Sequence, residues 1–241
     1  MILNLCFAAL AAAEFILVPY FLEASKDGRS KKSQILKAVC STLFLAAGIL
    51  SCIIVGNSTD YAKYIVIGLA LCWIGDFFLH PKQKNFIFII GALFFLAGHI
   101  YYICAYCTAI SALFPQASFW DWREIIVFVL AAAAGIVAAK LLKVKINSIF
   151  FVGVPYAVVL LLMLIKASSL GIRALTAGVA RDSVMFLLLI AGAVLFTVSD
   201  VMLAVNSITA HGQSIKFRRI SIITYYIAQF LIATTTMIIF A

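Results

Sequence analysis

Charged side chains are scarce in this sequence: Asp, Glu, Lys and Arg make up 11% of the 241 residues, while 66% are hydrophobic. A soluble domain contains about 25% charged residues, so this chain has too little polar surface to cover a water-soluble globule. It also lacks a long polar or low-complexity segment that would separate two domains. These absences exclude a soluble enzyme and favour one membrane-embedded domain over residues 1–241.

Histidine is also scarce, since the chain has only His80, His99 and His211. No His-x3-His pair occurs, whereas a catalytic zinc site normally takes three protein ligands in tight geometry. The six cysteines fall within apolar segments, where a thiol behaves as a small hydrophobic group. One CxxC pair, Cys104 and Cys107, has no second pair to support a metal or redox site. We therefore expect no metal and no cofactor.

Apolar segments, by contrast, are abundant. A hydrocarbon core about 30 Å thick requires about 20 helical residues, and helices satisfy every backbone group inside it. The sequence therefore predicts an all-α fold, a polytopic membrane bundle of about eight transmembrane helices. The predicted helices cover roughly residues 2–22, 36–55, 62–80, 86–110, 124–141, 147–166, 183–205 and 220–240.

The basic residues predict how these helices are oriented. Of the 18 Lys and Arg residues, 13 fall in the loops after predicted helices one, three, five and seven, and loops rich in basic residues face the cytoplasm. We expect residues 23–35 and 206–219 in the cytoplasm and both termini outside it, with the inner membrane as the location in a bacterium. The net charge of +9 then indicates anionic lipid head groups as partners, not nucleic acid. Only the loop predicted after helix six, with Lys166, Arg173 and Arg181, departs from this asymmetry.

Few ionisable residues lie within the predicted spans, where they are costly and usually functional. Asp76 and Asp200 lie near the ends of helices three and seven, His99 lies inside helix four, and Glu14 lies near the middle of helix one. The predicted topology places both Asp residues on the cytoplasmic side. Two carboxyl groups withdrawn from water can share one proton, the pattern of a general acid beside a negatively charged partner.

Asp76 and Asp200 are 124 residues apart, as are Leu79 and Leu203, Tyr101 and Tyr225, and Tyr102 and Tyr226. An offset of four helices preserves orientation, so the spacing is consistent with two parallel four-helix repeats, although chance similarity also explains it. A repeat would place the two carboxyl groups at equal depth across a polar cavity open to the cytoplasmic leaflet and lined by His99 and Tyr226.

Several windows resemble the YhhN family: Gly75-Asp76-x-x-Leu79, Gly91-Ala92-Leu93-Phe94-Phe95, His99-x-x-Tyr102, Gly192-Ala193-x-Leu195-Phe196-x-x-Ser199-Asp200-x-x-Leu203-Ala204 and Tyr226-x-Ala228-Gln229-x-Leu231. The resemblance spans predicted helices two to eight, with Lys37-Ala38 where the family has Lys-Pro. It implies an eight-helix membrane hydrolase that cleaves the vinyl-ether bond of lysoplasmalogens, which are lysophospholipids. The products would be a fatty aldehyde and a glycerophospho-ethanolamine or -choline.

This chemistry suggests a role for each candidate. A vinyl ether is hydrolysed by protonation of its β-carbon, after which water captures the oxocarbenium ion. We expect Asp76 to be the general acid and Asp200 the cation stabiliser or water-activating base, although the two labels can be exchanged. The polar shell would comprise His99, Tyr102, Ser199, Tyr226 and Gln229, and the lipid phosphate would lie near Lys82, Lys84, Arg218 and Arg219.

Three other interpretations stay open from the sequence. A proton-coupled transporter of lipids or small molecules would use the same Asp residues as proton carriers. A metal-dependent membrane hydrolase would also place Asp and His within a helical bundle, although three histidines supply few ligands. Each Asp could also serve only the structure, by fixing a helix against Lys82, Lys84 or a neighbouring hydroxyl.

Overall fold

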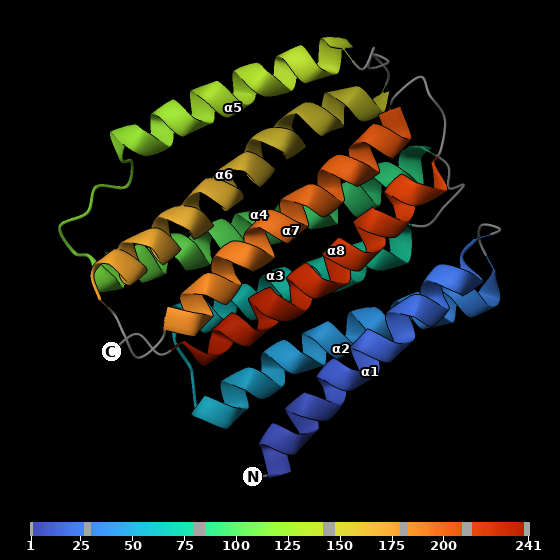
Figure 1. Ribbon diagram of the computed structural model, residues 1–241, viewed down its shortest axis with the longest axis horizontal. Helices are drawn as coiled ribbons and strands as arrows, with labels where there is room; N and C mark the ends of the chain where they lie inside the picture. The colour runs from blue at the N-terminus through green and yellow to red at the C-terminus, as the bar shows by residue number, and fades with distance from the viewer. Residues whose placement is uncertain are drawn as a thin grey trace.

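Eight long helices lie side by side in the computed structural model, which describes residues 2–26, 30–79, 85–141, 148–178, 183–208 and 214–238 (Figure 1). All eight are long and apolar enough to cross a bilayer, so the prediction of a multi-pass integral membrane protein is confirmed. The helices are α1 (Ile2–Ala24), α2 (Lys31–Val55), α3 (Asp60–Phe78), α4 (Asn85–Leu113), α5 (Trp122–Leu141), α6 (Ser148–Thr176), α7 (Ser183–Ile208) and α8 (Ile215–Thr234).

Three predicted helix ends were wrong, because charged residues were taken as loop residues. The second helix begins at Lys31 instead of residue 36. The sixth helix continues to Thr176 instead of ending at residue 166. Lys166 and Arg173 lie within it because each has an acidic partner: Glu124 is 2.6 Å from Lys166, and Asp121 is 3.0 Å from Arg173. Paired charges are less costly in a membrane than isolated ones, so they do not end the helix.

The eighth helix begins at Ile215 instead of residue 220. Arg218 lies in its first turn and donates a hydrogen bond to the backbone carbonyl of Ser25, just beyond the end of α1. The charged group of Arg218 thus has a polar partner at the end of the bundle. The basic residues before residue 220 can therefore belong to the helix.

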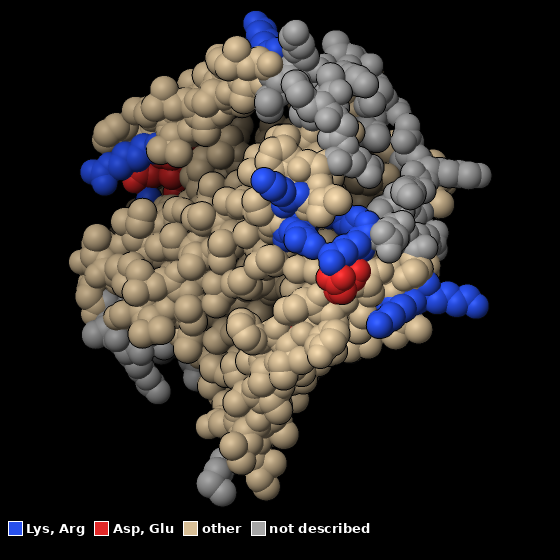
Figure 2. All heavy atoms as spheres, turned by 45° about the vertical axis from the view of Figure 1, so that its right-hand side comes forward, with Lys and Arg blue, Asp and Glu red and all other residues tan. Residues whose placement is uncertain are grey.

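Basic side chains gather at one end of the bundle. The C-terminal ends of α1, α3, α5 and α7 all lie at this end, at the right of Figure 1. Figure 2, which brings this end forward, shows Lys and Arg there and a mostly uncharged surface elsewhere. By position these residues include Lys26, Lys31, Lys32, Lys216, Arg218 and Arg219. The side of the membrane that this end faces stays a prediction.

The closest helix pairs are α3 with α4 and α7 with α8. Both pairs approach at a glycine: a Cβ at Gly68 would collide with the ring of Tyr102 and lie 3.1 Å from the Gly98 carbonyl, and one at Gly192 would lie 3.3 Å from the Ala228 carbonyl. Gly68 and Gly192 are 124 residues apart, the offset that also separates the two Asp residues. In addition, α4 packs on α6 as α8 packs on α2. These contacts are consistent with two parallel four-helix halves.

Candidate active site

Asp76 lies in the last turn of α3, where its buried carboxyl group meets side chains from α2 and α8. Its Oδ1 atom is 3.0 Å from Lys37 Nζ. Its Oδ2 atom accepts hydrogen bonds from Ser41 Oγ at 2.5 Å and from the Tyr225 hydroxyl at 2.7 Å. Lys37 also donates to the carbonyl of Leu79, one residue past the end of α3. One cation and two hydroxyl donors therefore surround this carboxyl group, as is typical of an ionised carboxylate.

Asp200, on α7, is also buried but has fewer donors. Its Oδ2 atom accepts a hydrogen bond of 2.5 Å from the Tyr156 hydroxyl on α6. The same atom is 3.6 Å from Nε2 of His99 on α4, which is too long for a hydrogen bond. Among the described residues, neither ring nitrogen of His99 makes a hydrogen bond of normal geometry, and the nearest backbone acceptor is that of Phe95, one turn earlier in α4. Among the residues that the structure describes, no Lys or Arg lies within ion-pair distance of Asp200.

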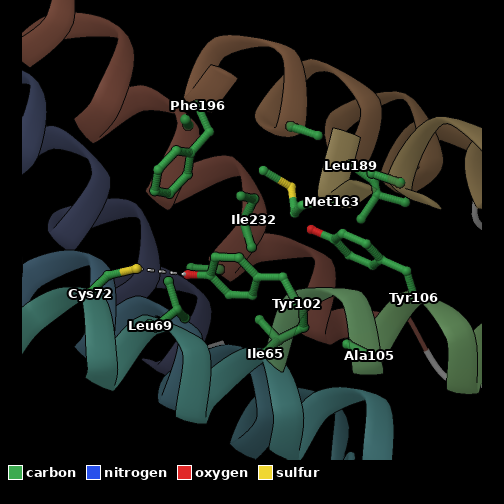
Figure 3. Packing of buried hydrophobic residues seen from close by; sticks show 14 of the residues in the cluster. Ile65, Leu69, Cys72, Tyr102, Ala105, Tyr106, Met163, Leu189, Phe196 and Ile232 are labelled. Carbon is green, nitrogen blue, oxygen red and sulfur yellow. Dashed lines mark hydrogen bonds between the residues drawn. The ribbon is translucent and has the colours of Figure 1, made fainter. Parts of the chain in front are cut away.

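A series of hydrogen bonds extends from Asp76 into the centre of the bundle. Tyr225, which donates to Asp76, accepts a hydrogen bond of 3.3 Å from Gln229 Nε2. The Tyr102 hydroxyl donates to Gln229 Oε1 at 2.8 Å and lies 3.9 Å from Cys72 Sγ, the contact drawn in Figure 3. The predicted shell residues Tyr102 and Gln229 therefore belong to the hydrogen-bond network of Asp76.

Phe196 on α7 connects the surroundings of the two carboxyl groups. Its ring centroid is 4.7 Å from that of His99, 5.6 Å from that of Tyr225 and 6.4 Å from that of Tyr102, with edge-to-face geometry in each case. Contacts thus lead from Asp76 through Tyr225 and Phe196 to His99, which lies beside Asp200. The structure thus brings Asp76, Asp200, His99, Tyr102 and Gln229 into one continuous buried region. Figure 3 shows the apolar side chains, including Phe196, that pack around Tyr102 in it.

Two predicted shell residues have other contacts. Ser199 donates to the carbonyl of Ser221 at 2.9 Å and so joins α7 to α8 instead of contacting either carboxyl group. The Tyr226 hydroxyl lies 3.4 Å from Ser41 Oγ and 3.5 Å from the Lys37 carbonyl. Tyr226 therefore reaches Asp76 only through Ser41.

The structure adds four side chains that sequence reasoning did not place in the site: Lys37, Ser41, Tyr156 and Tyr225. Lys37 was considered only for topology, although its position within the Lys-Pro window of the family resemblance could have identified it. Ser41 follows Lys37 by four residues and so lies on the same helix face. Tyr225 was noted only through its spacing from Tyr101, and no sequence signal marks Tyr156.

Several residues considered earlier lie outside the described residues, namely His80, Lys82, Lys84, Arg181 and His211. Lys82 and Lys84, which the sequence suggested as ion-pair partners of the Asp residues, are among them. Lys37 is the described cation that pairs with Asp76. Within the described ranges, no group of three His, Cys, Asp or Glu side chains is arranged to hold a metal ion.

Comparison with known proteins covers most of the chain. Residues 33–236 match the YhhN family. Over 200 residues the chain is 30% identical to a protein of Dictyostelium discoideum named "Lysoplasmalogenase homolog". The match covers 75% of this chain and 65% of that relative, slightly less than two thirds of its length. No solved structure matches the chain significantly. All of α1, including Glu14, precedes the family match.

Proposed function

The chain belongs to the YhhN family, and on that premise we propose that it is a membrane hydrolase that cleaves the vinyl-ether bond of lysoplasmalogens. The name of the Dictyostelium relative supports this substrate class, and eight apolar helices suit a lipid substrate that reaches the protein from the bilayer. The observation that carries the proposal is the unequal environment of two neighbouring buried carboxyl groups, Asp76 and Asp200.

The proposed reaction needs an acid, an anion and a water molecule. A proton moves from the acid to the β-carbon of the vinyl ether, which leaves an oxocarbenium ion. A water molecule adds to the cationic carbon and gives up a proton to a base. The resulting hemiacetal then collapses to the fatty aldehyde and the glycerophospho-ethanolamine or -choline, which leaves as the alcohol. A nearby carboxylate stabilises the cation, and a positioned side chain holds the water.

The contacts of the two carboxyl groups support exchanging the roles first expected for them. Asp200 then serves as the general acid, and Asp76 as the group that stabilises the cation. Asp76 has Lys37 and two hydroxyl donors, so it suits the anion that stabilises the oxocarbenium ion. Asp200 has one hydroxyl donor and no Lys or Arg among the described residues, so it suits the group that carries and donates a proton. The unpaired nitrogens of His99, beside Asp200, suit binding of the attacking water.

The remaining polar residues position these groups. Tyr102 and Gln229 hold the hydroxyl of Tyr225 against Asp76. Because all three side chains are buried, losing one leaves another without its partner, which costs more than the bond itself contributes. Tyr102 and Gln229 are therefore proposed as positioning residues.

The test is incubation of the purified protein in detergent with lysophospholipids that differ only at the sn-1 position. We expect free aldehyde from the alkenyl lipid and none from the alkyl ether with the same head group. In D2O, aldehyde trapped at once as a hydrazone should carry one deuterium next to its carbonyl carbon, since the proton is added there. Proton transfer to carbon in the slow step should also reduce the rate in D2O.

The same experiment separates the hydrolase from a proton-coupled transporter. No gradient can exist in detergent, so a transporter would release no aldehyde there. If no alkenyl lysolipid yields aldehyde while the protein moves a solute across liposome membranes, the hydrolase proposal is wrong.

A further inference from the structure

Glu14, near the middle of α1, is a buried carboxyl group that the proposed mechanism does not use. It is 6% exposed, and neither of its oxygens has a hydrogen-bond partner among the described residues. The other buried acids, Asp76, Glu124 and Asp200, each have at least one donor. A carboxylate without a partner is costly in a hydrocarbon environment. An ionised Glu14 would therefore need a partner that the described residues do not provide.

Glu14 lies on the side of α1 that faces the candidate active site. Together with Val18 and Phe21 it forms the buried face of this helix, and the spacing of four and then three residues places all three on one stripe. That stripe packs against α2 and α8. Phe21, on the same stripe as Glu14, has its ring centroid 6.1 Å from that of Tyr226 on α8, so this face of α1 borders the same buried region.

Three aromatic rings lie in this region. The centroid of the Tyr226 ring is 6.1 Å from that of Phe21 and 6.4 Å from that of Phe44. All three side chains are buried. A carboxylate and aromatic rings in one buried region are the combination that binds alkylammonium and quaternary ammonium groups, through charge and cation–π interactions.

The charges of the region leave Glu14 without a cation. Lys37 is the one cationic side chain found near Asp76 among the described residues, and it already pairs with that carboxylate and with the carbonyl of Leu79. Among the described residues no Lys or Arg pairs with Glu14, so this position suits a positively charged group of a ligand.

We propose that Glu14, with the rings of Phe21, Phe44 and Tyr226, binds the ammonium group of the substrate's head group. This inference rests on the proposed function, since it assigns an amine-bearing head group to the same lysolipid. It also assigns a binding role to α1, all of which lies outside the match to the family.

The test compares two alkenyl lysolipids that differ in one group. The first has a phosphoethanolamine head group, and in the second a hydroxyl replaces the ammonium. We expect the wild-type protein to prefer the amine in kcat/KM by about 10- to 100-fold, the size of one hydrogen bond to a charged group. In Glu14→Gln this preference should fall toward one. Glu23→Gln, an exposed residue of α1 that pairs with Lys26, should keep the wild-type preference.

Equal losses for both substrates in Glu14→Gln would overturn the subsite, because a merely structural residue affects them alike. A wild-type protein that cleaves both lipids equally well would also overturn it while leaving the hydrolase intact. If Glu14→Gln does not fold, Phe21→Leu supplies the same comparison, since it removes a ring and no charge.

Binding experiments with alkyl ether analogues of the two lipids, which cannot be hydrolysed, test the ammonium subsite independently of the hydrolase activity. The amine analogue should raise the Tm of the wild-type protein in detergent more than the hydroxyl analogue does, and Glu14→Gln should lose this difference. If no aldehyde forms but this Glu14-dependent difference is found, the hydrolase fails and the ammonium subsite stands. If aldehyde forms and the two analogues stabilise the protein equally, the subsite fails and the hydrolase stands.

Discussion

Lys37 and Asp76 join α2 to the end of α3 through an ion pair of 3.0 Å, in which the two side chains are 13% and 4% exposed. Lys37 also donates to the carbonyl of Leu79 at the end of α3, where a cation interacts favourably with the helix dipole. Ser41 and Tyr225 donate to the same carboxyl group. One buried charge thus determines how α2, α3 and α8 meet at the candidate active site.

Lys37→Met should lower the free energy of unfolding by about 3–5 kcal/mol, because it leaves Asp76 buried without its cation. The double variant Lys37→Met/Asp76→Asn should recover most of that loss. Unfolding by SDS in mixed micelles measures both. Lys63→Met, which breaks the exposed pair with Asp60, should cost less than about 1 kcal/mol. Equal losses in the single and double variants would show that the pair is not the cause.

Asp200→Asn should lower kcat by about 10²–10⁴-fold, since the amide keeps the shape of the side chain but cannot donate the proton. Asp76→Asn should lower kcat by about 10²–10³-fold through weaker stabilisation of the cation, while the slower rate in D2O persists. Asp60→Asn, an exposed change on the same helix as Asp76, serves as the control. Full turnover in Asp200→Asn with loss in Asp76→Asn would return the acid role to Asp76.

His99→Phe should lower kcat by about 10²-fold if the ring nitrogens hold the attacking water. Phenylalanine retains an aromatic ring for the contacts with Phe196 and Tyr156, so the thermal stability should change little. His99→Ala should lose both activity and stability. Wild-type turnover in His99→Phe would assign the histidine a packing role only.

Gly68→Ala should destabilise the protein by about 1–3 kcal/mol, because the added methyl group meets the ring of Tyr102 between α3 and α4. It should also lower turnover, since Tyr102 supports Gln229 and Tyr225. Gly135→Ala in α5, where an added Cβ meets nothing within 4 Å, should leave both properties unchanged. SDS unfolding and the aldehyde assay measure the two effects.

A membrane-impermeant thiol reagent tests the orientation in intact cells. Cysteines placed at Ser30 and Ser214 should stay unlabelled until the membrane is opened, because the basic end is expected in the cytoplasm. Cysteine at Ser58, in the exposed turn between α2 and α3, should react at once. The unmodified protein supplies the background from its six native cysteines. Labelling of Ser30 and Ser214 variants in intact cells would reverse the topology.

Hydropathy along the chain was sufficient to predict the eight helices. In a hydrocarbon core each backbone group has to be paired within its own helix, so local composition determines which segments span the membrane. The end of α6 was one exception, because Lys166 is neutralised by Glu124, which lies 42 residues earlier in the chain. Composition within one segment contains no information on such a partner.

The sequence by itself also identified Asp76, Asp200 and His99, because ionisable residues are rare within apolar spans. Only the tertiary structure determined their different environments. The donors to Asp76 come from positions 35 and 149 residues away, Ser41 and Tyr225, and Tyr156 reaches Asp200 from another helix. Which hydroxyl or cation meets which carboxyl group depends on how the helices rotate and pack at contacts such as Gly68 with Tyr102. Those contacts form between distant segments, so no local pattern in the chain specifies them.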